Sequence, residues 1–325
     1  MPSSPATDNS ASRPKGETTV KGGTGALSAQ GYKADVRNDK VLVYVNGAFV
    51  PRNEARVSIF DAGFVLGDGV WEGLRLVKGK LISLEAHLDR LFEGARAIDL
   101  DIGHDRAGVV KAIQDTLDTN SMTDGAHIRM MITRGVKSTP NQDPRFIVSG
   151  PTIVIVAEYK SPLPEAKAKG YSLFTSTFRT SNPDMFDLRL NSHSRLNLIQ
   201  ALIQAIHAGA DEALMLDPRG FVASCNSTNF FIVRGRELWT STSAYSFKGI
   251  TQGNVIAAWR AAGGVAKECD FTLTQVYSAN EAFVTGTLGG VTPVTKVDGR
   301  RIADGEPGPV TKEASDLYLR SVGAL

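Results

Sequence analysis

The sequence predicts an α+β fold in two domains, and three observations support this prediction. Short apolar segments, several of them in hairpins, mix with amphipathic helices without regular βαβ alternation. Two prolines in Ser161-Pro-Leu-Pro164 disfavour regular structure near the middle of the chain and mark a linker. The 325 residues, 42% of them apolar, are enough for a sizeable core in each domain. Because the chain has no G-x-G-x-x-G or Walker pattern, a dinucleotide-binding fold is not expected.

The N-terminal segment, residues 1–35, is rich in Ser, Thr, Gly and Ala and shows no sustained apolar periodicity. We therefore expect it to be a disordered tail. It lacks the apolar core of a secretory signal, and Asp8 and Glu17 argue against a transit peptide. Cys225 and Cys269 have neither metal-ligand spacing nor the density of a disulfide scaffold, which favours a reducing compartment. The expected location is the cytoplasm.

The distribution of charged, apolar and metal-binding residues limits the kinds of partner that we expect. The chain has 36 Lys and Arg against 34 Asp and Glu, and no long basic stripe with interleaved aromatics, so we expect no nucleic-acid partner. No apolar run approaches the roughly 20 residues that span a bilayer, so we expect no membrane partner. No cysteine or histidine cluster indicates a metal. A small molecule is the expected ligand.

The first domain, predicted for residues 40–160, opens in β-structure. Asn46-Gly47 separates two apolar runs and supplies the positive φ angles that a two-residue hairpin turn requires, and Lys78-Gly79 repeats this pattern. Ser83 is expected to cap a helix with one apolar face, and a second helix is predicted at 109–117. Strands are predicted at 41–45, 48–50, 70–76, 80–84, 127–132 and 152–157.

The second domain, predicted for residues 165–325, mixes the same two kinds of element. A helix at 196–208 is expected to bury the side that carries Leu196, Ile199, Ile203 and Ile206. Another helix is predicted at 254–262, and strands are predicted at 213–216, 230–233 and 281–284.

Four separated segments together resemble the class IV aminotransferases, the family of branched-chain and D-amino-acid transaminases. They are Asp61-Ala-Gly-Phe-Val-Leu-Gly-Asp-Gly-Val-Trp-Glu-Gly-Leu-Arg75, Gly209-Ala-Asp-Glu-Ala-Leu-Met-Leu-Asp217, Asn229-Phe-Phe-Ile-Val233, and Gly249-Ile-Thr-Gln252 with Gly286-Thr287 downstream. The resemblance covers roughly residues 40–319. It implies a D-amino-acid aminotransferase-like fold, with a small α/β domain and a larger pseudo-barrel domain. It also implies pyridoxal phosphate (PLP), or its amino form pyridoxamine phosphate (PMP), at a homodimer interface, with an amino acid and a 2-keto acid as substrates.

The resemblance implies a phosphate site. Arg75 matches the family's phosphate-binding arginine, whose guanidinium fork suits phosphate oxygens. Gly249 lets the backbone approach closely, and the amides of Ile250 and Thr251 would meet the phosphate at a helix N-terminus. Thr287-Leu288 matches the other phosphate-side segment. An ion pair at Arg75 and an ordinary helix start at Gly249 remain the alternatives.

Three aromatic and basic positions match the ring and substrate side of the family's site. Phe247 is expected against the pyridine face, and Trp71 near the substrate side chain, with core packing as the alternative for both. Arg129 matches an arginine that faces the substrate pocket, where it suits a carboxylate. A solvent-facing arginine is its alternative.

The chain departs from the family at the catalytic lysine. That lysine lies 18 positions before the glycine of Gly-Ala-Asp-Glu, and 209 − 18 = 191, which is asparagine here. No lysine occurs between Gly170 and Lys248. Asn191 can neither form a Schiff base nor shuttle a proton. Lys248 and His193 are the nearest candidate amine and base, although an exposed lysine and a structural histidine are the simpler interpretations.

Two further positions depart from the family. Ser224 stands where the family has a glutamate that keeps the pyridine nitrogen protonated, and a serine hydroxyl can only hydrogen-bond to a largely neutral nitrogen. Gln252 replaces an arginine. The sequence thus predicts a PLP- or PMP-binding homologue that transfers amino groups if it is active. A non-catalytic binding protein and a lyase like aminodeoxychorismate lyase are the alternatives.

Overall fold

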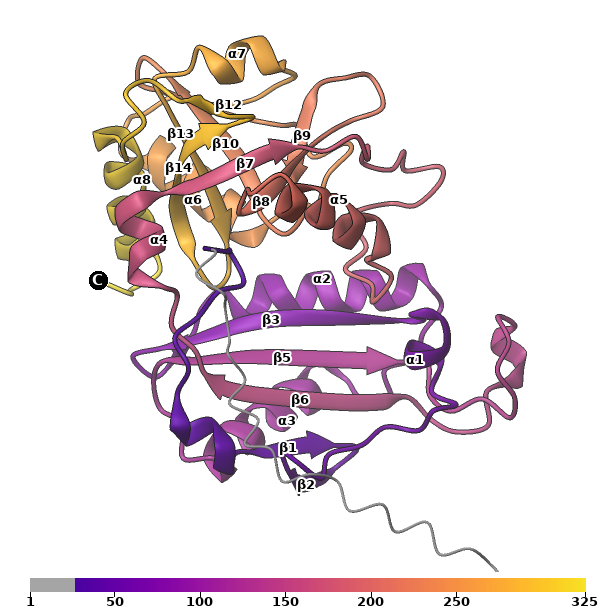
Figure 1. Cartoon of the computed structure of the whole chain (residues 1–325). Coiled ribbons are helices and arrows are strands. Elements are labelled where there is room, and N and C mark those ends of the chain that lie inside the picture. The colour runs from indigo at the N-terminus through magenta and orange to yellow at the C-terminus, as the bar shows by residue number, and fades with distance from the viewer. Residues whose placement is uncertain (1–26) are drawn as a thin grey trace, which may run out of the picture.

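The computed structural model describes residues 27–325, which form two domains around one β-sheet each (Figure 1). Residues 1–26, which include most of the predicted tail, lie outside the described part. The end of that predicted tail is placed: Ala29 is buried, and Tyr32 forms an isolated β-bridge with Pro162. The first described residues therefore pack beside the predicted linker.

The first sheet has six strands in the order β2-β1-β6-β5-β3-β4. Its strands are β1 (Leu42–Val45), β2 (Ala48–Pro51), β3 (Gly69–Val77), β4 (Lys80–Leu81), β5 (Ala126–Thr133) and β6 (Thr152–Tyr159). The helical segments of this domain are η1 (Val36–Lys40), α1 (Ala62–Leu66), α2 (Leu84–Ala97), α3 (Arg106–Thr119) and η2 (Pro144–Phe146). Figure 1 shows α2 lying along β3, on the side that faces the second domain.

Both predicted hairpins are confirmed. Asn46 and Gly47 adopt φ angles of 48° and 89°, and Val77 pairs with Lys80 across the second turn. Ser83 precedes α2 as predicted, but the prediction that its side chain caps the helix is wrong. The Ser83 hydroxyl instead accepts a hydrogen bond from Nδ2 of Asn254 at 2.9 Å. Ser83 thereby connects the start of α2 to the second domain.

The second sheet has nine strands, with the path β12-β11-β10-β13-β14-β7-β8-β9 and β15 paired to β14. Its strands are β7 (Tyr171–Thr175), β8 (Glu212–Leu216), β9 (Val222–Cys225), β10 (Asn229–Arg234), β11 (Glu237–Thr240), β12 (Ala266–Glu268), β13 (Glu281–Gly286), β14 (Gly290–Val297) and β15 (Arg300–Arg301). Its helices are α4 (Pro164–Lys169), α5 (Leu196–His207), α6 (Ile250–Ala261), α7 (Leu273–Tyr277) and α8 (Pro309–Ser321). Alternate residues of β10 face different cores, because strand side chains alternate between the two faces of a sheet.

Helix α5 is present as predicted, but the prediction of its buried side is wrong. Ala201 and Ala205 are fully buried against Ala213 and Met215 of β8. The large apolar residues point outward: Leu196, Ile199, Ile203 and Ile206 are 68%, 50%, 45% and 57% exposed. The alanines let the helix approach the sheet closely, so the bulky face of α5 remains on the surface.

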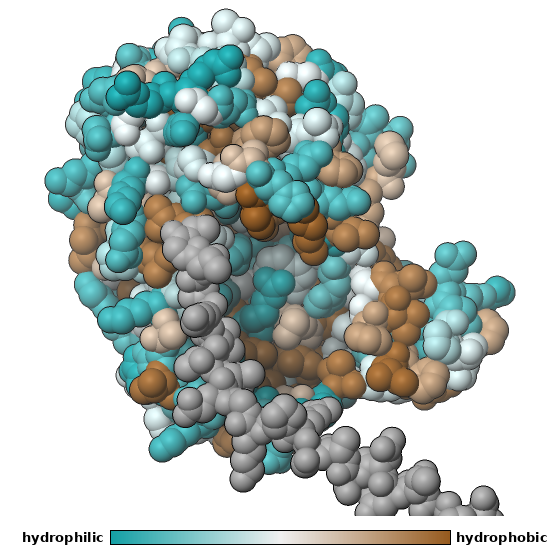
Figure 2. Space-filling view, in the orientation of Figure 1, coloured by the Kyte–Doolittle hydropathy of each residue, from teal (hydrophilic) through white to brown (hydrophobic). Residues whose placement is uncertain are grey.

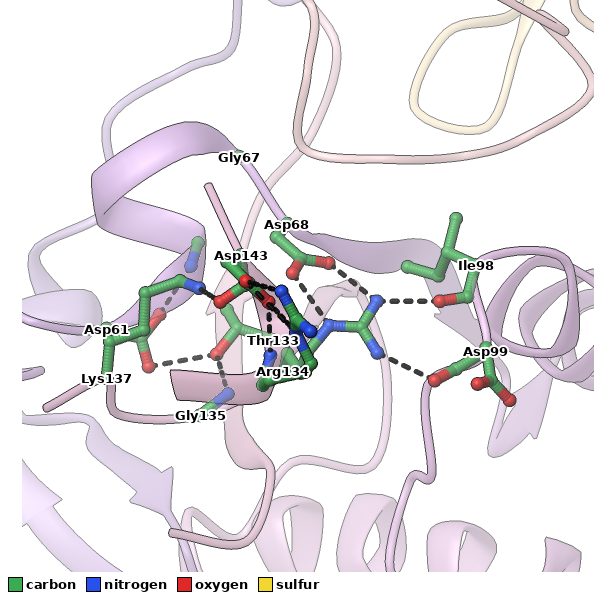
Figure 3. Close-up of polar contacts among 12 residues, drawn as sticks. Asp61, Gly67, Asp68, Ile98, Asp99, Thr133, Arg134, Gly135, Lys137 and Asp143 are labelled. Atoms are coloured by element: carbon green, nitrogen blue, oxygen red, sulfur yellow. Dashed lines mark hydrogen bonds and ion pairs between the residues drawn. The ribbon is translucent and has the colours of Figure 1, made fainter. Parts of the chain in front are cut away.

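A cluster of hydrogen bonds connects the loops at the start of β3 (Figure 3). Arg134 donates to both carboxylate oxygens of Asp68, at 2.7 and 3.0 Å, and to the carbonyls of Ile98 and Asp99 at 2.6 Å each. The side chain of Thr133 donates to Asp61 at 2.9 Å. These contacts fix the end of β5 to the segment that leads into β3, the strand along which the candidate site lies.

Candidate active site

The candidate site lies in the cleft between the two sheets and follows β3. Trp71, Gly73 and Arg75 lie on one face of β3, because alternate residues of a strand share a face. Arg129 of β5 pairs with Gly73, so its side chain lies beside those of Trp71 and Arg75. Two cavities open along this face. One is lined by Arg75 and the other by Trp71 and Arg129.

The first cavity, of about 350 Å³, brings together the residues that the sequence assigns to phosphate. Arg75, Ile250, Thr251 and Thr287 all line it. Arg75 donates from Nη1 to the carbonyl of Leu288 at 2.9 Å, whereas its Nε is buried without a hydrogen-bond partner among the described residues. Burial lowers the pKa of Arg75 from its usual value. A guanidinium N–H that is buried and unpaired is a site for an anion.

Gly249 shapes this cavity indirectly. It is the residue before α6, and a Cβ atom at this position would collide with Oδ1 of Asn229 on β10. Asn229 in turn donates from Nδ2 to the carbonyl of Phe247 at 2.7 Å. Glycine is therefore required because the start of α6 approaches β10 closely. This close contact holds the first amides of α6 at the cavity wall, where the helix dipole is positive.

The second cavity, of about 280 Å³, collects the residues expected near the pyridine ring and the substrate. Trp71, Arg129, Asn191, Ser224 and Phe247 all line it. The Ser224 hydroxyl donates to the carbonyl of Thr228 at 2.7 Å, so it already has a protein partner. The guanidinium carbon of Arg129 lies 3.3 Å from the centre of the Trp71 ring, a cation–π contact.

Asn191, which the motif spacing predicts to stand in place of the family's lysine, is 2% exposed, and both ends of its amide form hydrogen bonds. Its Nδ2 donates to the carbonyl of Trp71 at 2.6 Å and to Oε1 of Glu72 at 3.3 Å. Its Oδ1 accepts from Nη2 of Arg195 at 2.6 Å. A neutral amide that forms hydrogen bonds through both its nitrogen and its oxygen therefore occupies position 191.

Glu72 carries the buried negative charge of the cleft. It is fully buried, and it accepts two hydrogen bonds from Arg90, at 2.7 and 2.8 Å, and one from His87 at 2.7 Å. Burial by itself would raise the pKa of Glu72, but the hydrogen bonds from Arg90 and His87 outweigh it and lower the pKa. The carboxylate therefore stays ionised and holds α2 to β3.

Arg195 is a site residue that the sequence analysis missed. It lines the second cavity, and its guanidinium carbon lies 5.5 and 5.9 Å from the ring centres of Phe247 and Trp71. Burial, together with the nearby charge of Arg129, lowers the pKa of Arg195 to about 10, and burial likewise lowers that of Arg129 to about 10. Both stay charged near neutral pH. The sequence did contain a signal for this residue: Arg195 lies four residues after Asn191, at the start of the predicted helix.

The remaining predicted residues lie outside the two cavities. His193 is not among the lining residues of either one, and burial lowers its pKa. Lys248 is exposed, and its backbone carbonyl accepts from Arg90. Gln252 is buried and donates to Thr240 at 3.0 Å. Among residues 27–325, no group of three or more His, Cys, Asp or Glu is arranged to hold a metal ion.

A cavity lined by an arginine and by the N-terminus of a helix, in the cleft between two domains, is typical of enzyme folds that bind a phosphorylated cofactor. The chain belongs to the class IV aminotransferases, whose family model (amino-transferase class IV) matches residues 69–297. This is a family of PLP proteins.

Two curated relatives support the assignment. The chain is 40% identical over 283 residues to branched-chain-amino-acid aminotransferase-like protein 1 of Arabidopsis thaliana, covering 87% of this chain and 51% of the relative. The chain thus spans about half the length of that protein. It is 36% identical over 277 residues to a putative branched-chain-amino-acid aminotransferase of Methanocaldococcus jannaschii, covering 85% of this chain and 94% of the relative.

A solved structure confirms the predicted two-domain fold. A branched-chain amino acid aminotransferase solved with pyridoxamine 5′-phosphate superposes on this chain with a TM-score of 0.82 at 28% identity. The match covers 88% of this chain and 95% of that chain. Within residues 27–325, none of the helices is long and apolar enough to cross a membrane.

Proposed function

We propose that this chain binds PLP or PMP in the interdomain cleft, with an amino acid or 2-keto acid as its second ligand. The main support is Arg75: its buried Nε has no hydrogen-bond partner within residues 27–325, and it lines a cavity with Thr287 and the first residues of α6. The donor set suits a phosphate, because it joins a guanidinium to a helix N-terminus. A structure of the same branched-chain amino acid aminotransferase with N-(5′-phosphopyridoxyl)-L-glutamate supports the same pair of ligands.

Each half of the cleft has its own part in binding. Arg75, Ile250, Thr251 and Thr287 would hold the phosphate, and Phe247 would cover one face of the ring. Arg129 would receive the carboxylate of the acid. When bound, PLP supplies an aldehyde that exchanges amino groups and a ring that withdraws electrons. Ser224 offers no charge to that ring, and its single hydroxyl proton is donated to the carbonyl of Thr228.

We propose that amino-group transfer, the reaction of the family, runs far below the family rate in this chain. Asn191 can neither bond covalently to the cofactor nor carry a proton, and its amide is engaged with Trp71 and Arg195. Loss of a placed general base removes about 10²–10⁴ in rate. A non-catalytic role as a PLP- or PMP-binding protein is the second candidate, and the bonded amide of Asn191 favours it. The lyase alternative needs the same lysine and gains no support.

Isothermal titration calorimetry with PLP and PMP tests the binding proposal. We expect saturable binding of both at micromolar concentration. The PLP complex should lack the pH-dependent absorbance band of a lysine-bound cofactor. No binding by either compound at these concentrations would overturn the proposal, whereas that band would show that another amine serves as the lysine.

We further propose that the chain acts as a homodimer in the cytoplasm. Figure 2 shows apolar surface on both sides of the cleft mouth, over α5 and around α1. Ile59, Phe64 and Leu66 near α1 are 69%, 69% and 57% exposed, and the outward face of α5 is equally apolar. Such patches mark protein interfaces. Cys225 and Cys269 are free thiols, which suits a reducing compartment.

Light scattering on the protein and on Ile199→Glu/Ile203→Glu tests the homodimer. We expect a dimer that becomes a monomer in the double variant, because two buried charges would oppose association. A matched change at exposed Val36 should leave the mass unchanged. A monomeric natural protein would refute the proposed homodimer. Cell fractionation tests the proposed location in the cytoplasm.

A further inference from the structure

The cavity assigned to the phosphate contains a second cation that no sequence motif indicates. Lys167, on α4 directly after the linker, lines this cavity together with Arg75. None of the described residues that line the cavity is an aspartate or a glutamate. The other titratable groups at its wall are His87 of α2, which is bonded to Glu72, and Tyr318 of α8. Asp124 lies near enough to Arg75 to interact with its charge, but it is not among the residues that line the cavity. Among the described lining residues, the two cations therefore give the cavity an excess of positive charge.

The two cations hold the same turn. Lys167 donates from Nζ to the carbonyl of Gly289 at 2.6 Å and also to that of Val291, and Arg75 donates to the carbonyl of Leu288. This turn joins β13 to β14 and includes Thr287. An ammonium group has three N–H donors, and carbonyls occupy only two of those of Lys167. The third remains for a ligand in the cavity.

We propose that Lys167 is a second phosphate-binding cation, which pairs with Arg75 to hold the phosphate of the cofactor as a dianion. This inference rests on the proposed function and adds to it. A phosphate monoester carries nearly two negative charges near pH 8, because its second pKa is about 6. One guanidinium balances only half of that charge. Lys167 supplies the rest and ties α4, the first element after the linker, to the bound cofactor.

If Lys167 binds the phosphate, its protonation should make the affinity depend on pH. Burial and the nearby charge of Arg75 lower the pKa of Lys167 to about 8. The charged form binds phosphate, so affinity is fully present below this pKa and falls as the pH rises through it. Bound phosphate would raise the pKa of Lys167, and binding near pH 8 should therefore take up protons.

Calorimetry with PMP tests the proposal in the natural protein, in Lys167→Met and in Lys167→Arg. PMP is the suitable probe because it has no aldehyde that reacts with amines. Lys167→Met keeps the length of the side chain but removes its charge, and we expect it to weaken PMP binding by about tenfold or more. The affinity of Lys167→Arg for PMP should stay within about threefold of that of the natural protein, because arginine keeps a charged hydrogen-bond donor at this position. Between pH 7 and pH 9, only the natural protein should show an additional loss of affinity and a proton uptake that depends on Lys167.

Pyridoxamine, which lacks the phosphate, separates an effect on the phosphate cavity from general damage to the cleft. If Lys167→Met weakens pyridoxamine and PMP equally, the inference is overturned. If Lys167 only positions the turn that carries Thr287, Lys167→Met will weaken PMP, but the natural protein will show no proton uptake that depends on Lys167, and this result also overturns the inference. Equal PMP affinity in all three proteins also overturns it. If the natural protein binds no PMP, the proposed function fails, and inorganic phosphate then decides the inference. Phosphate binding that is lost in Lys167→Met supports the second cation, and phosphate binding that is absent or unchanged refutes it.

Discussion

The two cavities of the cleft differ in the chemistry of the residues that line them. The phosphate half joins Arg75, Thr287 and the N-terminus of α6 around one cavity whose described lining includes no acidic residue. The half that we propose for the pyridine ring contains Asn191, whose amide oxygen accepts a hydrogen bond from the guanidinium of Arg195. Binding and chemistry therefore depend on separate residues of one cleft. A phosphate is held by cations and backbone amides that do not involve residue 191, so the binding half can persist when the chemical half changes.

The largest expected effect is a gain of activity in Asn191→Lys. A lysine would restore the amine of the family mechanism, and we expect the rate of amino-group transfer to rise by about 10²–10⁴. The charge of Arg195 should favour the reactive neutral amine. Single-turnover absorbance measurements with a branched-chain amino acid check this. Asn191→Met is the matched control, since it adds length without an amine, and equal rates in all three proteins would show that residue 191 does not limit the chemistry.

The second expected effect is a loss of stability in Glu72→Gln, whose carboxylate joins α2 to β3 beside Asn191. Removal of one partner of a buried ion pair costs about 3–5 kcal/mol, because Arg90 loses its counter-charge. Chemical denaturation measures the change. Glu85→Gln breaks the exposed pair with Arg106 and should change the stability far less, because water and salt screen exposed charges.

The same carboxylate predicts a pH dependence of stability. The folded-state pKa of Glu72 lies below its usual value, so its contribution is present above the unfolded pKa and is lost as the pH falls through the folded one. We expect the natural protein to lose stability below about pH 4, near the usual pKa of glutamate. The difference between natural protein and Glu72→Gln should shrink over that range. If the difference in stability stayed constant over this pH range, protonation of Glu72 would not be coupled to folding there.

The third expected effect is confined to the phosphate half. Arg75→Met removes the guanidinium whose Nε is unpaired among the described residues, and we expect PMP to bind about 10- to 100-fold more weakly, as for loss of a charged hydrogen bond. Arg145→Met, at an arginine exposed beside Asp143, is the control and should leave the affinity unchanged. Unchanged affinity in Arg75→Met would remove the basis for the phosphate site.

The smallest expected effect belongs to the pyridine half. Arg195→Gln should weaken binding of 4-methyl-2-oxopentanoate by about tenfold or less, because one of two guanidiniums near the acid is lost. PMP affinity should remain within about twofold, since Arg195 lies away from the phosphate cavity. Competition titrations measure both values. If PMP and the keto acid weaken together, the two halves are coupled, and their separation as independent sites fails.

The secondary structure was predictable where short-range geometry decides it. The turn at Asn46-Gly47 and the helix at α5 both follow from local residues, and both are confirmed. The orientation of α5 was not predictable, because periodicity identifies a two-faced helix but not the surface that each face meets. Close contact with β8 selected the alanine face, and Leu196 to Ile206 stayed outside.

The sequence by itself determined the family, because the order and spacing of its motifs are encoded along the chain. The phosphate residues and the role of position 191 remain predictions from the same spacing. Only the tertiary structure decided which charges share the cleft. Lys167 reaches the phosphate cavity from α4, and Arg195 reaches the pyridine half from the start of α5. Neither residue belongs to a motif. Their positions depend on how the two domains pack, and contacts between residues more than a hundred positions apart leave no periodic signal in the chain.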